Sequence, residues 1–419
     1  MWRITIRICL VSSFPPVKGG EANYAQNFVS ALEKYFPNEI SEIHVLTHTE
    51  GEKSGKYEKK GKVEVFRLFD SLSFLSRNFA FAKIFLKIMN IRPDLVHLQY
   101  STIPNGRYGG LLGESLFILF VLLKLVRIPF YITMHSLWLP DQSEERIYEK
   151  TKNRALSRLA TWYLKVFTYL FAMFPQKLFL LVNIRGSKLT EEFCQAYHIP
   201  LGRVREEIHG VWVDKETVRT DIKNSKRMVC LGVMHPSKGY EFTIKAMIHV
   251  LKKFPKSSLI IAGSPAQTNY DEGKRYIDKL RDTIIEYGLT SSVSIEDRYL
   301  SDDEFAEYIR TAAIVLLSYS RTVGGSGIMH AAIMYNVPII ATGSGLHFEE
   351  LTDFISIVPP KNADALANEI TKILGSTEYR TTLIRNYERY LSDHDWSVVT
   401  RDNYEEYIKK LKFKRSKPI

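Results

Sequence analysis

The chain has 419 residues, 45% of them hydrophobic and 25% charged; this excludes a disordered protein, and the length exceeds that of one ordinary domain. Its three cysteines are widely scattered, which excludes a disulfide framework and predicts a reducing cytoplasm. The net charge is +11, and the first 215 residues carry 29 Lys and Arg against 20 Asp and Glu. This basic first half predicts an anionic partner, although a solvated surface with spare lysines would have the same composition.

The first half alternates short β-rich runs with helical stretches, which indicates a parallel, doubly wound sheet. The N-terminus alternates too much for a signal-peptide core and is predicted as the first strand. The longest apolar run, residues 115–123, is too short to span a bilayer. The predicted strands are residues 4–12, 43–47, 63–68, 95–99, 130–133 and 177–181.

Two predicted helices of this half are unusual in composition. Residues 111–126 have almost no polar face, and we interpret them as a core helix. Residues 153–174 mix Arg154, Arg158 and Lys165 with a broad aromatic and leucine surface. A basic amphipathic helix with aromatic residues suits a membrane interface, and a core helix is the alternative.

The second half repeats the scheme after a polar segment, residues 213–228, that we interpret as a linker. Its predicted strands are residues 228–232, 258–262, 293–295, 314–317, 338–341 and 355–357. A last helix, residues 400–412, precedes a basic tail. We therefore predict two Rossmann-like domains, residues 1–212 and 213–395, with residues 396–419 as a helix and tail that pack back on the first domain.

A glycine-rich loop in the second half predicts a phosphate site. Strand 313–317 is followed by Gly324, Gly325 and Gly327, then by an apolar helix over residues 326–335 and a further buried strand. Glycines let backbone N–H groups approach an anion, and a helix N-terminus favours negative charge. The loop also follows the carboxyl end of a strand, where open α/β sheets bind ligands.

Eight motifs, taken in order, resemble those of glycosyltransferase family 4. They are PPVKGG at 15–20, PDLVHLQ at 93–99, TMH at 133–135, IHGVWVD at 208–214, GVMHPSKG at 232–239, IIAGS at 260–264, DRY at 297–299 and the glycine loop. The resemblance implies a GT-B fold, with two domains facing across a cleft, and a retaining hexosyltransferase that uses a nucleotide-diphospho-sugar. A non-catalytic nucleotide-sugar-binding subunit, or an epimerase or phosphorylase of the same fold, is the alternative.

The same resemblance assigns residues to roles. His135 and Lys238 are implied as catalytic, because a lysine ammonium can neutralise the departing diphosphate and a histidine in the position of His135 lies near the sugar. The predicted donor-binding residues are Gly20, His235, Lys238, Gly263, Arg298, Tyr299, Gly325, Ser326, Gly327, His330 and Glu349. Gly20 and the glycine before it are also candidates for an acceptor phosphate, and His330 is equally well interpreted as a core histidine.

The chain departs from the common pattern at two positions. Many family members carry two glutamates around the glycine loop, and Thr322 and His330 stand in their place. The sequence Gly324-Gly325-Ser326-Gly327-Ile328-Met329-His330 instead resembles a branch that reads GSSGxxH. An arginine is also replaced by Val233, although Lys238 remains. These departures concern the donor more than the class of reaction.

We predict neither a metal nor a cofactor beyond the sugar donor. Asp393-His394-Asp395 is interpreted as a cap and turn, and no His or Cys cluster has zinc spacing. No dinucleotide fingerprint follows the first strand, and no nucleic-acid module is present. The basic first half, with Arg154, Arg158 and Lys165, predicts a cytoplasmic protein, peripheral at the inner face of the cell membrane, whose acceptor is a lipid-linked or growing glycan.

Overall fold

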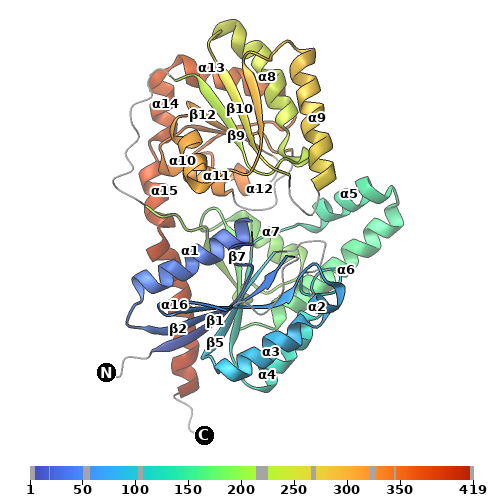
Figure 1. Ribbon diagram of the computed structural model, residues 1–419, viewed down its shortest axis with the longest axis vertical. Helices are drawn as coiled ribbons and strands as arrows, with labels where there is room; N and C mark the ends of the chain where they lie inside the picture. The colour runs from blue at the N-terminus through green and yellow to red at the C-terminus, as the bar shows by residue number, and fades with distance from the viewer. Residues whose placement is uncertain are drawn as a thin grey trace. The chain divides into compact units, whose positions relative to one another are not determined.

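Figure 1 presents a computed structural model that describes residues 5–17, 19–50, 57–101, 107–213, 225–265, 270–320, 326–343 and 346–415. The chain forms two compact units. Unit 1 comprises Met1–Gly210 and Trp396–Ile419, and unit 2 comprises Val211–Asp395. The last helix, α16 (Trp396–Arg415), therefore belongs to unit 1 although it follows unit 2 in sequence.

The sheet of unit 1 has the order β3-β4-β2-β1-β5-β6-β7-β8, and only the β3–β4 pair is antiparallel. The central strands are buried on both faces, as expected for a parallel sheet covered by helices. The strands are β1 (Ile6–Val11), β2 (Ile40–Thr49), β3 (Tyr57–Lys60), β4 (Val63–Asp70), β5 (Leu95–Tyr100), β6 (Phe130–Met134), β7 (Leu178–Val182) and β8 (Val204–Ile208).

The helices of unit 1 form two groups. α1 packs against α16, where Phe36 stacks on Tyr404 with ring centroids 4.5 Å apart. α3 packs against α4, and α4 contacts α6 through aromatic rings (Figure 1). The helices are α1 (Gly20–Tyr35), α2 (Phe74–Asn78), α3 (Ala80–Ile91), α4 (Leu116–Leu125), α5 (Pro140–Thr151), α6 (Arg154–Met173), α7 (Lys188–Ala196) and the 3-10 turn η1 (Leu201–Arg203).

The sheet of unit 2 is fully parallel, with the order β11-β10-β9-β12-β13-β14. From β9 the strands β10 and β11 are added on one side, whereas β12, β13 and β14 are added on the other, so the strand order reverses between β9 and β12 and makes this the topological switch point. The strands are β9 (Arg227–Leu231), β10 (Ser258–Gly263), β11 (Val293–Asp297), β12 (Ile314–Leu317), β13 (Ile339–Thr342) and β14 (Ser356–Val358).

The helices of unit 2 bury one apolar side against this sheet. In α8, for example, Ile244, Met247 and Val250 recur at helical spacing and are fully buried. The helices are η2 (Pro236–Lys238), α8 (Tyr240–Lys253), α9 (Tyr270–Glu286), α10 (Asp302–Arg310), α11 (Gly327–Met334), α12 (Leu346–Glu349), α13 (Ala363–Gly375), α14 (Thr377–Ile384) and α15 (Tyr387–His394).

The predicted fold of two Rossmann-like parallel sheets is confirmed, and every strand predicted from sequence is present. Two strands were not predicted, β3 and β8, because both are rich in charged residues. The last helix begins at Trp396, four residues earlier than predicted. Asp393 and His394 are the end of α15 rather than a turn, and Asp395 is its C-cap. Residues 214–224 of the predicted linker lie outside the described residues.

The interpretation of residues 111–126 as a core helix is only half correct. The helix itself begins at Leu116 and buries Leu116, Leu119, Phe120 and Leu123. Its opposite side is just as apolar but remains exposed, and Leu125 is 72% exposed. None of the described helices combines the length and the hydrophobicity that a bilayer crossing requires.

Candidate functional site

The switch point of unit 2 brings together two loops that sequence analysis had singled out. One loop follows β9 and contains His235 and Lys238, and the other follows β12 and leads into α11. Lys238 ends the short turn η2, and its ammonium nitrogen lies 3.8 Å from the centre of the Tyr319 ring. Tyr319 is buried, so this cation–π contact fixes the direction of the lysine.

Tyr319 also connects the lysine to the start of α11. Its hydroxyl oxygen is 3.3 Å from the Ser326 hydroxyl, and Ser326 caps the helix by accepting the Met329 N–H at 3.4 Å. The N–H groups of Gly327 and Ile328, at the first two helical positions, have no intrahelical acceptor. Lys238 and the N-terminus of α11 thus form an electropositive site suited to a diphosphate. Gly325 lies outside the described residues.

The two loops are held together by backbone contacts. The Ser318 hydroxyl donates to the Lys238 carbonyl at 3.0 Å, and the Ser320 N–H donates to the Ser237 carbonyl at 2.9 Å. Gly239 allows this approach, because a Cβ there would lie 2.2 Å from the Ser318 carbonyl oxygen. Its φ of 63° is also in the left-handed region that favours glycine.

We expect Gly239→Ala to destabilise unit 2 by about 1–3 kcal/mol, because the added methyl group must push the two loops apart. Gly288→Ala is the matched control: Gly288 has the same φ of 63°, but a Cβ there would meet no atom within 4 Å. Urea denaturation of both variants measures the difference. Equal losses in the two variants would show that backbone strain, rather than loop contact, accounts for the effect.

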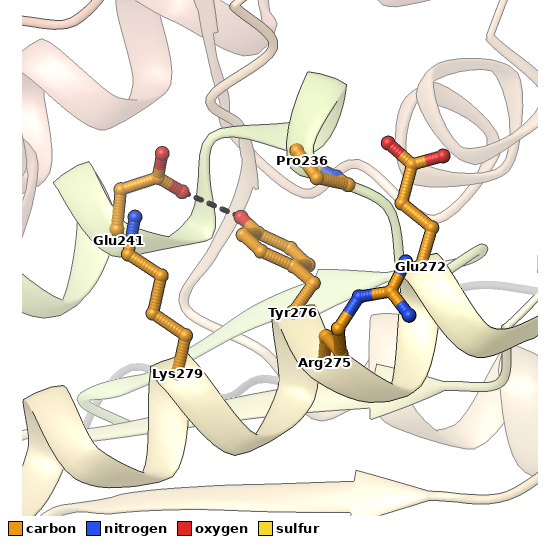
Figure 2. Close-up of a pocket in the computed structure, with 6 residues that line it drawn as sticks. All are labelled: Pro236, Glu241, Glu272, Arg275, Tyr276 and Lys279. Atoms are coloured by element: carbon orange, nitrogen blue, oxygen red, sulfur yellow. Dashed lines mark hydrogen bonds between the residues drawn. The ribbon is translucent and has the colours of Figure 1, made fainter.

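His235 stabilises the loop that carries Lys238 through contacts inside that loop. Its Nδ1 accepts the Ser237 N–H at 3.1 Å and lies 2.8 Å from the Ser237 hydroxyl. Its Nε2 faces Glu272 of α9 at 3.7 Å. Beside it is a hollow of about 250 Å³, in which the Tyr276 hydroxyl donates to Glu241 at 2.5 Å (Figure 2). The lining residues are Pro236, Glu241, Glu272, Arg275, Tyr276 and Lys279, so two carboxylates balance two cations in the hollow.

The other predicted donor residues of unit 2 are spread along the carboxyl edge of the sheet. Gly263 ends β10, and a Cβ there would lie 1.8 Å from the Gly232 carbonyl oxygen, so close packing alone requires glycine. Arg298 and the exposed Tyr299 follow the edge strand β11, and Arg298 is paired with Glu296 at 3.1 Å and Glu304 at 2.6 Å. Arg298 and Tyr299 therefore lie two strands away from β9 and the switch point, and Gly263 lies one strand away.

His330 and Glu349 differ in their surroundings. His330 is buried on α11, and its Nδ1 lies 3.0 Å from the Tyr390 hydroxyl of α15, which favours the interpretation as a core histidine. Glu349 is exposed at the end of α12, next to Gly343 and close to the carboxyl end of β13. Its carboxylate is therefore available at the edge of the sheet that carries Lys238.

Unit 1 has a cavity at its own switch point, between β1 and β5. Its volume is about 210 Å³. It is lined by Ser13, Gly19, Gly20, Glu21, Ala22, Ser101, Arg107 and Ser136. Gly20 opens α1 here, and neither Glu21 nor Arg107 was predicted, although Glu21 directly follows the glycine pair.

The charges in this cavity suit a hydroxylated ligand. Burial raises the pKa of Glu21, but the Arg107 guanidinium, 3.8 Å away, the His135 ring and serine hydroxyls outweigh it and hold that pKa below its usual value. The Ser13 hydroxyl donates to Glu21 at 3.0 Å and accepts from Arg107 at 2.5 Å. An ionised carboxylate can accept hydrogen bonds from sugar hydroxyls, and the guanidinium beside it can donate to them, whereas the carboxylate would repel a phosphate at the same position.

His135 follows β6, directly before Ser136 of the cavity wall. Its Nε2 contacts the side-chain oxygen of the buried Gln99, and its ring meets the Tyr24 ring edge-on with centroids 4.8 Å apart. Burial lowers the pKa of His135 to about 4, against an opposing effect of Glu21, so the imidazole is neutral at pH 7. Because the Gln99 oxygen accepts, Nε2 carries the proton and Nδ1 can accept one.

The three basic residues predicted to contact a membrane all lie on α6, but two have partners on α5. The Arg154 guanidinium is 3.9 Å from the Tyr148 ring centre, and Arg158 pairs with Glu144 at 3.7 Å. Within the described ranges no three His, Cys, Asp or Glu side chains converge on a possible metal position. The three cysteines are buried, and burial raises the pKa of each thiol.

Residues 214–390 match the family model described as Glycosyl transferases group 1. Unit 2 carries a group 1 glycosyltransferase domain. The glycine loop and Lys238 both lie within the matched residues. A sequence comparison with curated proteins finds no match.

Solved structures resemble the chain over both units. Sucrose-phosphate synthase from Thermosynechococcus elongatus is 18% identical, with 97% of this chain and 99% of that chain covered and a TM-score of 0.68. HepE from Anabaena, in complex with UDP and glucose, is 15% identical, with coverage of 96% and 98% and a TM-score of 0.66. The UDP-forming α,α-trehalose-phosphate synthase from Burkholderia xenovorans, in complex with glucose-6-phosphate, is 12% identical, with coverage of 97% and 100% and a TM-score of 0.67. This likeness shows that the fold around the glycosyltransferase domain is GT-B.

Proposed function

We propose that the protein transfers a sugar from a nucleotide-diphospho-sugar to an acceptor hydroxyl with retention of configuration. The observation that supports this most directly is the position of Lys238 beside the N-terminus of α11, at the switch point of the glycosyltransferase domain. A fixed ammonium group and free helix N–H groups are the donors that a diphosphate requires.

The charge arrangement explains how these residues would assist the reaction. When the bond between the anomeric carbon and the diphosphate breaks, its electron pair stays on the phosphate oxygen, and negative charge develops there. Lys238 and the N–H groups of Gly327 and Ile328 would stabilise that charge. Glu349 is proposed to accept hydrogen bonds from donor hydroxyls, and His235 to hold the lysine loop in place.

Unit 1 is proposed to bind the acceptor. Its cavity presents Glu21 and Arg107 to hydroxyl groups, and the neutral imidazole of His135 lies beside it. The resemblance to family 4 implies that this histidine lies near the transferred sugar. The basic composition of this unit supports a lipid-linked acceptor or growing glycan, met by a cytoplasmic enzyme at the inner face of the membrane.

Donor turnover by the purified full-length chain tests this function. UDP-sugars are the first donors to examine, because the solved structures that resemble the chain include one in complex with UDP and one named as UDP-forming. We expect release of nucleoside diphosphate and a product with the donor's anomeric configuration. Binding of UDP, seen as a rise in melting temperature, without turnover of any sugar nucleotide would instead favour a non-catalytic binding subunit.

We expect transfer to continue in the presence of EDTA, because Lys238 and the α11 N-terminus would neutralise the diphosphate without a cation. Product formation before and after chelation measures this. A loss of activity that Mg²⁺ or Mn²⁺ restores would contradict the prediction and would assign Asp393 and Asp395 as candidate metal ligands.

A further inference from the structure

Most exposed large hydrophobic side chains of the described residues lie between Leu72 and Leu170 of unit 1. They are carried by α2, α3, α4 and α6 and by the turns beside them. The most exposed include Phe74, Leu75, Leu86, Leu125, Leu159 and Trp162, each with at least 62% of its surface accessible. Soluble monomers rarely expose contiguous apolar surface on this scale, so these helices lack a partner.

Helix α6 shows the pattern most clearly, because it is apolar on its outer side although its buried side, which includes Phe167 and Phe171, also contains polar residues. Ser157, Thr161 and Thr168 face the interior and are buried. The residues at the complementary positions are apolar and exposed, and Leu159 and Trp162 are each 62% accessible. The exposed residues recur at intervals of three and four, which places them along one side of the helix. Folding of unit 1 alone does not explain an apolar outer side.

The neighbouring helices extend this surface. α4 packs on α6 through Phe117 and Phe167, whose ring centroids are 5.2 Å apart, and α3 packs on α4. α4 exposes Ile118 and Leu125 on its outer side, and α3 exposes Leu86. The four helices lie together on one side of unit 1 (Figure 1).

The charges of these helices indicate the chemistry of the partner. α2, α3, α4 and α6 contain no aspartate or glutamate and seven basic residues: Arg77, Lys83, Lys87, Lys124, Arg154, Arg158 and Lys165. Arg154 and Arg158 contact the acid-rich helix α5, and the Lys87 ammonium lies 3.5 Å from the centre of the Phe66 ring. The other cations of these helices are Arg77, Lys83, Lys124 and Lys165, of which Lys83 and Lys124 are exposed. Glu114, which accepts from the Tyr163 hydroxyl beside these helices, is an acidic exception. Apolar side chains on helices that carry cations and no acidic residue are complementary to an anionic lipid surface.

We propose that α2, α3, α4 and α6 form a docking surface for an anionic membrane. The apolar side chains enter the interface between headgroups and acyl chains, while the lysines contact lipid phosphates. A handful of cations and a few inserted side chains give reversible attachment rather than permanent insertion. The functional role of this docking surface rests on the proposed lipid-linked acceptor. Its binding to membranes does not require sugar transfer.

Vesicle co-sedimentation of the full-length chain tests the surface. We expect binding to vesicles of phosphatidylcholine mixed with phosphatidylglycerol, little binding to phosphatidylcholine alone, and loss of binding as salt is raised. The triple variant Phe74→Ser, Leu159→Ser, Trp162→Ser should bind about tenfold more weakly or worse, since three inserted side chains are removed. Ile285→Ser with Leu201→Ser is the matched control, because both side chains are exposed but lie away from the four helices.

A second pair of variants tests the charges. Replacing Lys83, Lys124 and Lys165 by glutamine should weaken binding and reduce its dependence on salt. The same change at Lys245, Lys252 and Lys256 of unit 2 should have little effect. Circular dichroism of each variant verifies that the fold is retained.

Three outcomes would overturn the proposal. The first is a wild-type chain that stays in the supernatant with anionic vesicles at low salt. The second is an apolar triple variant that binds as the wild type does. The third is a wild-type chain that does not bind vesicles but forms a dimer, which the triple variant abolishes. The surface would then be an interface between two copies of the chain. Donor turnover in solution, measured on the same samples, separates this proposal from the enzymatic one, since either can fail while the other holds.

Discussion

Lys238→Ala should reduce donor turnover by roughly 30- to 1,000-fold. Removing one preorganised charge donor typically costs about 2–4 kcal/mol of transition-state stabilisation. Lys238 is held over Tyr319, whose hydroxyl contacts the Ser326 cap of α11, so its charge is directed before the donor binds. The loss should appear mainly in kcat, because the negative charge on the diphosphate grows as the anomeric bond breaks.

The fold should change little, since the side chain of Lys238 contributes a single, partly exposed cation–π contact to the buried Tyr319 ring, worth about 0.5–2 kcal/mol. Lys245→Ala is the matched control, because Lys245 is an exposed lysine of α8 in the same domain. We expect it to retain wild-type turnover and an unchanged melting temperature. Wild-type turnover in the Lys238→Ala protein would refute the assignment of this lysine to the diphosphate.

Apolar runs in the sequence were sufficient to predict every described strand except β3 and β8, because buried parallel strands are continuous apolar runs. β12, for example, has the predicted limits, Ile314 and Leu317. The pattern fails at β8, whose sequence VREEI resembles a surface segment. Glu206 accepts N–H groups of Gly186 and Ser187, and Glu207 is buried among hydrogen-bond donors, so tertiary contacts override the charge pattern. No local signal in the sequence reports such partners.

The candidate site was predictable only in part for a related reason. The position of Lys238 after β9 and of Ser326 before α11 follows from strand order and glycine spacing. Their connection through Tyr319 does not, because Lys238 and Tyr319 are far apart in the sequence and meet only when β9 and β12 become neighbours. The pair of Glu21 and Arg107 was missed likewise, since it forms when β1 and β5 align.

The structure around Glu207 supports a second large effect, on stability. Glu207 is 3% exposed, and its two carboxyl oxygens contact the hydroxyls of Tyr24 and Thr133. Thr133 is in turn 2.8 Å from His97 Nε2, and His97 Nδ1 contacts the Tyr407 hydroxyl of α16. This chain of hydrogen bonds connects α1, the sheet and α16 within unit 1.

Burial raises the pKa of Glu207 to about 7, while hydrogen bonds from Tyr24, Thr133 and Asn403 oppose the rise only in part. A carboxyl group in the unfolded chain has a pKa near 4.3. Between these two values the unfolded chain loses its proton and the folded chain keeps it. The contribution of Glu207 to stability is therefore complete at low pH and is lost as pH rises toward 7, by roughly 3 kcal/mol.

Glu207→Gln should remove this dependence on pH. Glutamine resembles the protonated carboxyl: its oxygen can accept from Tyr24, while its amide can donate to Thr133, which then donates to His97. We expect the free energy of unfolding of the variant, relative to wild type, to rise by roughly 3 kcal/mol between pH 5 and pH 8. Urea denaturation at both values measures it, with Glu192→Gln at an exposed position of α7 as the control. Parallel curves for wild type and Glu207→Gln would contradict the prediction, because they would mean that Glu207 titrates alike in the folded and unfolded chains and that its buried hydrogen bonds fully compensate its loss of solvent.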